Sequence, residues 1–147
     1  MKKIFLSLAM FVTLGTMSAF ADSSDVSPKV LTAFSNDFNS AKEVEWSVGA
    51  NYFRAAFTFN GNHVFAFYNA DGEMLGLTRY ISSLDLPMNL QRNLKKDYSD
   101  FWISDLFEVA NNNGTSYYIT LENADTKIVL KANANSNWTT YNKVRKA

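Results

Sequence analysis

The hydrophobic positions along the chain change from a helical period to a strand-like period, and they do so twice in the same order. Across residues 28–38 apolar side chains recur every three or four positions, which is typical of an amphipathic helix. Residues 52–59 instead alternate between apolar and polar side chains, which is typical of a half-buried strand. Four strand-like runs of this kind follow the first helical stretch and end at Tyr80.

The same succession then begins again. A helical stretch covers residues 87–98, and four further strand-like runs extend to Lys143. Corresponding apolar anchors lie roughly 60 to 64 positions apart, a spacing that indicates an internal repeat. We therefore divide the chain into two pseudo-repeats, about 26–82 and 84–145, which meet near residues 82–86.

This pattern predicts an α+β fold, in which a tandem pair of helix-plus-four-strand units forms one antiparallel sheet with both helices on one face. A single unit would leave a sheet edge open, and edge-to-edge pairing of two units gives a sheet of about eight strands. The residues expected to face the helices are apolar in both units: Phe53, Phe57, Phe65, Ile119, Leu121, Ile128 and Leu130.

The first residues match a secretory signal peptide. Lys2-Lys3 supplies a basic start, residues 4–12 are almost wholly apolar, and Ala19-Phe20-Ala21 is a small-x-small cleavage site. The apolar run is too short to cross a bilayer. We therefore expect residues 1–21 to be removed, leaving residues 22–147 as a single domain that is periplasmic or secreted and has no membrane span.

Charge and cysteine content exclude several classes of protein. The chain has 14 basic and 14 acidic residues, and loss of Lys2 and Lys3 leaves a slight acidic excess. No basic field is present that could hold nucleic acid. The chain has no cysteine, so no disulfide can support the exported protein, and its core must hold the fold together.

No set of residues has the spacing of a catalytic or metal centre. His63 is the only histidine and, without cysteines, makes a poor metal ligand. Glu43 and Glu45 could act as paired carboxylates, but they alternate with apolar residues as on a solvated strand face. Residues 69–72 indicate a hairpin turn, because the later ligands of a calcium loop are missing. We predict no catalytic residue, no metal, no cofactor and no enzymatic activity.

The face of the sheet turned away from the helices is the best candidate site. Tyrosines and basic residues share the strand positions expected there, a composition typical of binding hot spots. Cross-strand tyrosine pairs can also simply stabilise a sheet. The residues expected to contact a protein or peptide partner are Tyr52, Arg54, Tyr68, Tyr118 and Lys131.

Several stretches resemble a known family. They are Val44-Glu45-Trp46, Tyr52-Phe53-Arg54-Ala55-Ala56-Phe57, Phe67-Tyr68-Asn69-Ala70-Asp71-Gly72-Glu73-Met74-Leu75 and Leu86-Pro87. With its signal peptide and its twice-repeated helix and four strands, the chain resembles the PepSY-like, beta-lactamase-inhibitor-like (BLIP-like) proteins exported by Bacteroidetes-type bacteria. The resemblance covers about residues 26–145.

The resemblance implies a tandem fold with a concave sheet face, which in beta-lactamase inhibitor proteins grips an enzyme, and a role like that of PepSY inhibitors or pro-segments. True inhibitors usually carry disulfides, and their inhibitory residues do not match positions here, so only the idea of a binding sheet carries over. Two functions follow: a non-enzymatic binding or inhibitory module for a periplasmic or extracellular protein or peptide, or a small-ligand or envelope-stress carrier.

Overall fold

The computed structural model of the protein describes residues 20–147, so most of the predicted signal peptide lies outside the described residues. The first unit contains, in order, β1 (Phe20–Ala21), the 3-10 helix η2 (Ser23–Asp25), α1 (Pro28–Asp37), β2 (Lys42–Val48), β3 (Phe53–Phe59), β4 (Asn62–Tyr68) and β5 (Met74–Tyr80). The second contains η3 (Ser83–Asp85), α2 (Met88–Asp97), β6 (Trp102–Asn111), β7 (Gly114–Glu122), β8 (Thr126–Asn133) and β9 (Thr139–Arg145).

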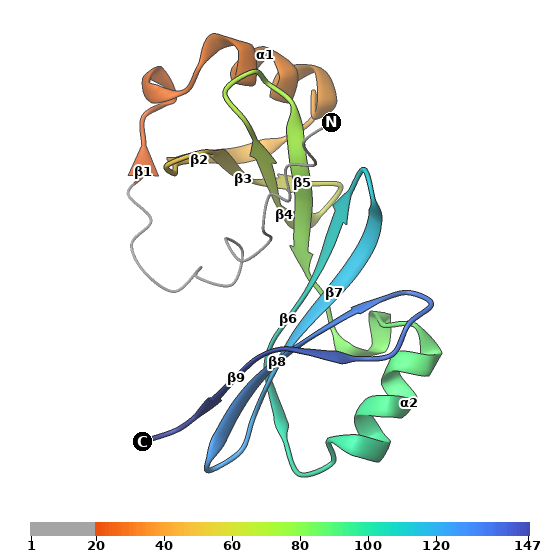
Figure 1. The fold of residues 1–147 in the computed structure, drawn as a ribbon. Helices are drawn as coiled ribbons and strands as arrows, with labels where there is room; N and C mark the ends of the chain where they lie inside the picture. Colours follow the sequence, from red (N-terminus) through yellow and green to blue (C-terminus); the bar gives the residue numbers. More distant parts are fainter. Residues whose placement is uncertain (1–19) are drawn as a thin grey trace, which may run out of the picture.

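The strands of the described residues 20–147 form one nine-stranded sheet whose spatial order is the order of the chain, β1 to β9, and each neighbouring pair is antiparallel (Figure 1). The two units join where β5 pairs with β6, from Leu77 opposite Ala110 to Tyr80 opposite Phe107. The α+β class is confirmed, and strands β2 to β9 correspond to the expected strands. The short strand β1 is an addition that the sequence pattern does not predict.

Both helices pack on the same face of the sheet. Under α1 the buried residues include Phe34, Trp46 and Phe57, and under α2 they include Leu90 and Leu130. The register links the two regions, because directly opposed residues of an antiparallel pair share a face. On β4, the residues that face α1 lie opposite one set of residues on β5. That same set on β5 lies opposite the residues of β6 that face α2. The opposite face, which we call the helix-free face, is therefore continuous across both units.

One predicted orientation is wrong. Phe65 lies on the helix-free face, opposite Ala56 and Thr78, whereas its neighbours Val64 and Ala66 belong to the core under α1. Strand β4 is apolar on both faces, so alternation alone does not tell which residues point toward the helix. The predicted helix-facing positions Phe53 and Phe57 are confirmed, as are Ile119, Leu121, Ile128 and Leu130.

Turn chemistry explains where the strands reverse. Asn60 and Gly61 both have positive φ, 49° and 78°, which is the backbone geometry of the two-residue hairpin that joins β3 and β4. The side chain of Asn69 accepts hydrogen bonds from the backbone N–H groups of Asp71 and Glu73, each at 3.0 Å, and so shapes the β4–β5 turn. No helix within residues 20–147 is long and apolar enough to cross a membrane.

Candidate binding face

Aromatic rings cross the helix-free face in a continuous row that we call the aromatic ladder. Its members are His63, Phe65, Tyr80, Phe107, Tyr118 and Tyr141. Successive ring centroids lie 4.9, 5.9, 6.5, 5.3 and 5.6 Å apart. These separations are those of favourable aromatic pairs. Because the ladder passes through the β5–β6 junction, it links the two units on this face.

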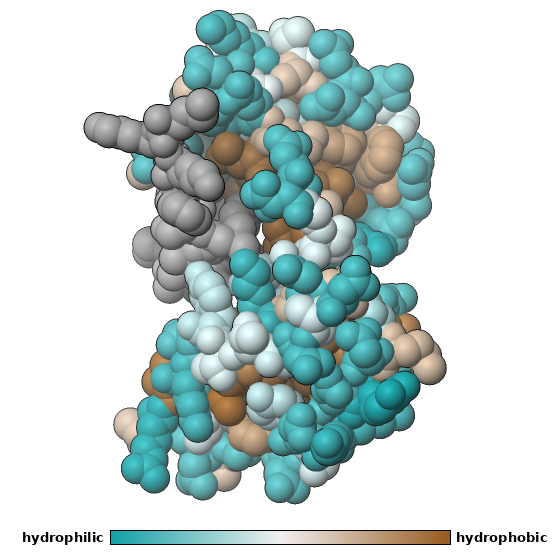
Figure 2. Space-filling view, turned by 45° about the vertical axis from the view of Figure 1, so that its right-hand side comes forward, coloured by the Kyte–Doolittle hydropathy of each residue, from teal (hydrophilic) through white to brown (hydrophobic). Residues whose placement is uncertain are grey.

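Exposure differs along the ladder. Tyr80 is 54% exposed and His63 is also exposed, whereas Phe107 and Tyr118 are buried. The buried pair is stacked, with only 8° between the ring planes, and belongs to a cluster on this face with Val109 and Val129. The buried rings therefore support the ladder, and the exposed rings are the ones a partner could touch. On the side of the molecule seen in Figure 2, hydrophobic residues emerge among hydrophilic ones in both the upper and the lower part.

Two cations lie over rings of this ladder. The guanidinium carbon of Arg54 is 5.5 Å from the centroid of Phe65, and the ammonium nitrogen of Lys131 is 5.5 Å from that of Tyr118. Each distance falls within the range of a cation–π contact. Arg54 Nε also donates a hydrogen bond of 2.9 Å to Ser47 Oγ, which fixes its direction. Each unit thus contributes one oriented cation to the helix-free face.

Tyr118 has an unusual polar environment. The residue is fully buried, and its hydroxyl is the buried side-chain polar atom that lacks a hydrogen-bond partner among residues 20–147. Burial raises the pKa of Tyr118 above its ordinary value, and the nearby Tyr141 hydroxyl adds to this effect. An unsatisfied buried hydroxyl costs about 1–3 kcal/mol.

An acidic group also lies on this face. Burial raises the pKa of the Asp105 carboxyl, although a backbone hydrogen bond from Leu106 and the charge of Lys127 oppose the shift. The pKa of Tyr80 is raised as well, first by burial and then by the charge of Asp105, while Arg54 acts in the opposite direction. The helix-free face therefore presents charges of both signs beside apolar rings, not a field of one sign.

Four of the five predicted contact residues lie at this face. Arg54, Tyr118 and Lys131 are on its strands, and the ring of Tyr52 in the β2–β3 loop packs against Phe67 with centroids 5.6 Å apart. The placement of Tyr68 on this face is wrong. Its side chain is fully buried on the helix side, where its hydroxyl donates a 3.0 Å hydrogen bond to Asp37 Oδ2. Burial and this bond both raise the pKa of Tyr68.

The misplacement of Tyr68 and that of Phe65 have one cause. Asn60-Gly61 forms a two-residue turn, so counting outward from it sets Phe57 opposite Val64. Phe65 then falls on the other face, and Tyr68 falls on the same face as Val64. The same count would have found the ladder in β4, because the turn signal fixes the register as well as the reversal.

Sequence reasoning also missed Tyr80, Phe107 and Tyr141. Phe107 adjoins Leu106 and Tyr80 adjoins Ile81, so two neighbouring apolar residues compete for the helix side and alternation does not tell which one faces it. The bulge between Val129 and Leu130 shifts the register of β8 and β9 near Tyr141.

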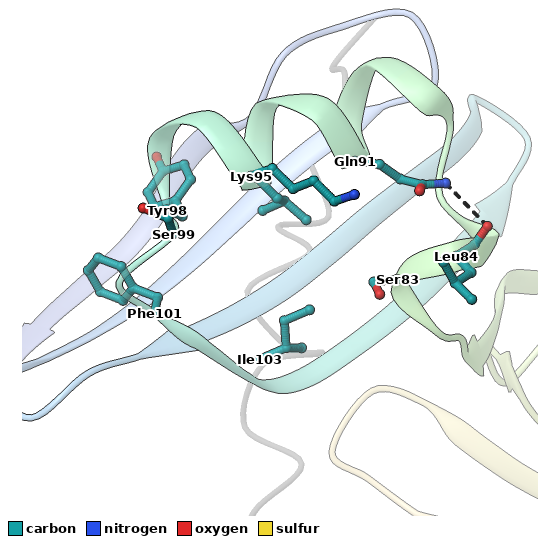
Figure 3. Close-up of a pocket in the computed structure, with 9 residues that line it drawn as sticks. Ser83, Leu84, Gln91, Lys95, Tyr98, Ser99, Phe101 and Ile103 are labelled. Carbon is teal, nitrogen blue, oxygen red and sulfur yellow. Dashed lines mark hydrogen bonds between the residues drawn. The ribbon is translucent and has the colours of Figure 1, made fainter.

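A separate candidate site lies outside the helix-free face. A shallow cavity of about 250 Å³ opens between η3, α2 and the start of β6, lined by Ser83, Leu84, Gln91, Leu94, Lys95, Tyr98, Ser99, Phe101 and Ile103 (Figure 3). Gln91 Nε2 donates hydrogen bonds to the backbone oxygens of Leu84 and Leu86, at 3.2 and 2.8 Å, and holds η3 beside α2. The lining is mostly apolar, with Lys95 as its charged member.

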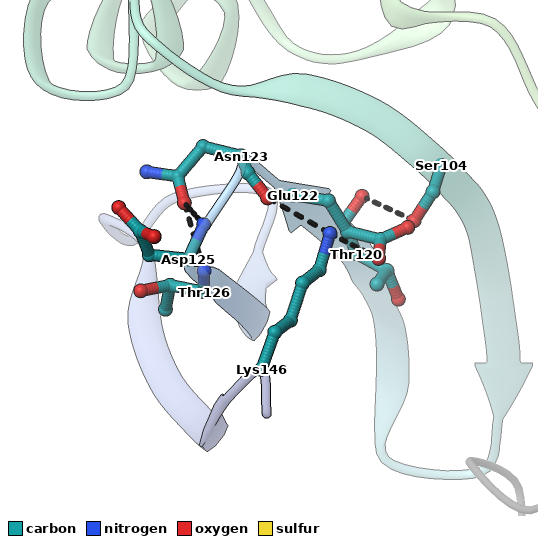
Figure 4. Close-up of polar contacts among 7 residues, drawn as sticks. All are labelled: Ser104, Thr120, Glu122, Asn123, Asp125, Thr126 and Lys146. Carbon is teal, nitrogen blue, oxygen red and sulfur yellow. Dashed lines mark hydrogen bonds and ion pairs between the residues drawn. The ribbon is translucent and has the colours of Figure 1, made fainter.

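The polar contacts at the far end of unit two have a structural role. Lys146 Nζ lies 3.2 Å from Glu122 Oε1 and donates a 2.8 Å hydrogen bond to the backbone oxygen of Asn123 (Figure 4). The same ammonium group lies 4.9 Å from the ring centroid of Trp102. These contacts fasten the segment after β9 to the β7–β8 turn.

Within residues 20–147, no three His, Cys, Asp or Glu side chains are grouped so that they could hold a metal ion.

Comparisons with known proteins bear on the fold. No family model matches the chain, and no curated protein matches it with significant similarity. Among solved structures, a BLIP-like protein from Bacteroides fragilis aligns with 16% identity and a TM-score of 0.69, over 84% of this chain and 92% of that one. A DUF2874 family protein from Bacteroides ovatus aligns with 19% identity and a TM-score of 0.71, over 82% and 89%.

A candidate periplasmic protein from Bacteroides eggerthii aligns with 14% identity and a TM-score of 0.71, over 82% of this chain and 88% of that one. At these identities the likeness concerns the fold alone. The expected BLIP-like fold is therefore confirmed, while the PepSY part of the resemblance stays an expectation. None of the three names denotes an enzyme.

Proposed function

We propose that the processed protein is an exported, non-enzymatic binding module that holds a protein or peptide partner on its helix-free face. The observation that carries this proposal is the aromatic ladder, which continues across both units and includes the exposed rings of His63 and Tyr80. Tyrosine offers a large contact area for few rotatable bonds and adds a hydroxyl group, so exposed Tyr80 is a suitable anchor.

The charged groups support a protein partner in particular. Arg54 and Lys131 are held over rings by cation–π contacts, and a guanidinium group can bind a carboxylate through two parallel hydrogen bonds. A sheet face with apolar rings, two cations and the carboxylate of Asp105 suits a partner with complementary charges around an apolar centre. An inhibitory role, as in the BLIP-like and PepSY-like proteins, is one form that such binding could take.

The proposed place of action is the periplasm or the exterior of the cell. The basic start, apolar run and small-x-small site of residues 1–21 support export. The fold shared with a candidate periplasmic protein is consistent with this location. The partner is accordingly a periplasmic or extracellular protein or peptide, and the proposal includes neither nucleic acid nor a cofactor.

A small-ligand carrier is the second candidate, and the cavity beside α2 is the observation in its favour. Its volume of about 250 Å³ lies below the roughly 300–1,000 Å³ of pockets that enclose drug-sized ligands. The protein partner is therefore the better supported of the two candidates.

The test uses the exported protein as bait in a periplasmic extract, followed by identification of what is retained and measurement of its affinity. Tyr80→Ala should weaken binding by about 2 kcal/mol, roughly thirtyfold, as expected for an aromatic anchor. Leu84→Ala is the matched control, since Leu84 is 81% exposed but lines the cavity beside α2. Loss of binding in Leu84→Ala with none in Tyr80→Ala would instead assign function to the cavity.

A further inference from the structure

The strand pairing at the start of unit one repeats the pairing that joins the two units. Phe20 of β1 lies opposite Ser47 of β2, and Tyr80 of β5 lies opposite Phe107 of β6. Both residues of the second pair lie 60 positions after those of the first. The strand that precedes each α-helix, β1 or β5, thus pairs with the strand that follows that helix, β2 or β6, and the two pairings have equivalent registers.

The two positions are filled to different extents. Beside β6, the first long strand of unit two, lies the full seven-residue strand β5, whereas beside β2 of unit one lies β1 with only two residues. Both β1 residues belong to the segment that the sequence predicts will be cleaved off. After cleavage β2 would become an edge strand, with no described strand on its outer side. Strand β9 already has no described strand on its outer side.

We propose that β9 of a second copy of this chain occupies the position beside β2, so that the processed protein associates head to tail. The proposal rests on cleavage after Ala21 and concerns a surface separate from the helix-free face. Strand β9 is the counterpart of β5, because each is the last strand of its unit and pairs with the strand before it. The β5–β6 junction inside the chain is therefore a template for a β9–β2 junction between two chains.

The backbone groups of β2 are oriented for such a junction. The Gly49 N–H donates a 2.9 Å hydrogen bond to the Tyr52 oxygen across the β2–β3 hairpin, so Gly49 points inward. Backbone groups of successive strand residues point to opposite sides, so those of Val48 and Trp46 point outward. The junction of the two units agrees, because the Ile81 N–H donates to the oxygen of Leu106, which is the counterpart of Trp46.

The backbone groups of β9 are oriented in the matching way. The Lys146 N–H donates a 2.8 Å hydrogen bond to the Asp125 oxygen, toward the β8 side. By the same alternation, the backbone groups of Arg145 and Lys143 point away from β8. Antiparallel pairing of Lys143 with Val48 and of Arg145 with Trp46 would satisfy the outward groups of both strands.

The side chains of the two edges are complementary. Strand β2 carries Lys42, Glu43 and Glu45, whereas β9 carries Lys143 and Arg145, so the two strands have opposite net charge. In the register above these side chains do not lie directly opposite one another, and the opposite charges favour pairing of unlike edges through longer-range attraction. Both edges also carry an exposed valine, Val48 at 45% and Val144 at 52%.

A β-bulge between Lys42 and Glu45 limits the regular part of β2, so we expect a short junction and weak association. Because the contact joins different edges, it does not close into a symmetric dimer.

The experiment follows association by sedimentation velocity over a concentration series. The sample is protein recovered after export from an expressing bacterium, and mass spectrometry should place its first residue at Asp22. Val48→Pro and Lys143→Pro each remove one outward N–H without removing an internal ladder bond, and each should weaken association by about tenfold or more. The matched controls Val48→Ala and Lys143→Ala keep the N–H and should stay within about threefold of the unchanged protein.

Mixing the two proline variants gives the sharpest result. Val48→Pro retains an intact β9 and Lys143→Pro retains an intact β2, so the mixture should form a one-to-one dimer at concentrations where each variant alone is largely monomeric. Self-pairing of β2 would instead leave Lys143→Pro unaffected and the mixture unrestored, which would overturn the proposal. A protein that stays monomeric to about 1 mM, or that retains Phe20 and Ala21 after export, would also overturn it. If Val48→Pro fails to fold, as thermal unfolding would reveal, Lys143→Pro and its alanine control decide the question.

Discussion

The two units share an order of elements but fill their cores with different kinds of side chain. Unit one buries aromatic residues under α1, namely Phe34, Phe38, Trp46, Phe57 and Tyr68. Unit two buries mainly aliphatic residues under α2, namely Leu86, Leu90, Leu106, Ile119, Leu121, Ile128 and Leu130. The difference teaches that the pattern of apolar positions sets this topology, whereas the identity of the side chains sets how each core is packed.

Packing in unit one depends on ring geometry. The centroid of Phe57 lies 5.0 Å from that of Phe34 and 4.8 Å from that of Phe38, and Phe34 in turn meets Trp46 at 5.2 Å. Aromatic pairs with such tilted or edge-on geometry contribute about 0.5–1.5 kcal/mol beyond the burial of their area. We therefore expect unit one to respond more strongly than unit two to loss of a single core side chain.

The largest expected effect compares one substitution in each core. Phe57→Ala should lower the free energy of unfolding by about 3–5 kcal/mol, and Leu130→Ala by about 2–5 kcal/mol, because both side chains are fully buried. Chemical denaturation of the two variants measures both values. A loss below about 1 kcal/mol for Phe57→Ala would place this ring outside the core and would remove the basis of the comparison.

A smaller effect compares two buried tyrosines. Tyr68→Phe removes the hydrogen bond to Asp37 and should cost about 1 kcal/mol. Tyr118→Phe removes a hydroxyl without a partner, so stability should stay the same or rise by up to about 1 kcal/mol. Denaturation of both variants in one buffer tests the difference in sign. Destabilisation of Tyr118→Phe by as much as Tyr68→Phe would mean that the Tyr118 hydroxyl is hydrogen-bonded in solution.

The smallest effect depends on pH and concerns Asp105. Burial raises the pKa of this carboxyl in the folded state, so its charged form is less favourable in the fold than in the unfolded chain. Below the unfolded pKa of about 3.9 both states are protonated and the residue costs nothing, whereas the penalty develops as the pH rises through the folded pKa. Asp105→Asn should therefore raise the melting temperature at pH 7 and lose this advantage near pH 3.

The control for this experiment comes from unit one. Glu45 is exposed and lies 60 positions before Asp105. Glu45→Gln should change the melting temperature little at either pH, as exposed substitutions usually do. An equal gain in both variants would show that the Asp105 effect comes from net charge and not from local burial.

The sequence predicted the elements and their order well, because helix and strand periods were clear in both repeats. Prolines marked the starts of α1 and α2, and Asn60-Gly61 marked the β3–β4 hairpin. Strand β1 was not predicted, since two residues carry no period of their own. Its pairing depends on β2, which lies far along the chain.

The candidate face was predicted only in part. Arg54, Tyr118 and Lys131 followed from alternation in strands with one polar face, but β4 carries apolar residues on both faces and misled the assignment of Phe65 and Tyr68. Contacts such as the stacking of Phe107 on Tyr118 depend on the register between strands. Alternation within one strand carries no information about that register, although turn lengths do.

The strictly sequential order of the sheet has a consequence for how the chain folds. Nearly every strand pairs with its nearest neighbours in sequence through a short turn, so most pairings close small loops. The β1–β2 and β5–β6 pairings are different, because a 3-10 helix and an α-helix lie between the two strands of each pair. Local pairings of this kind favour rapid folding for a mainly β protein. We expect each unit to form first and the β5–β6 strand pairing to form last. The side chains of Arg79 and Glu108 meet at this junction, 3.0 Å apart. Substitution of either residue should therefore speed unfolding more than it slows folding.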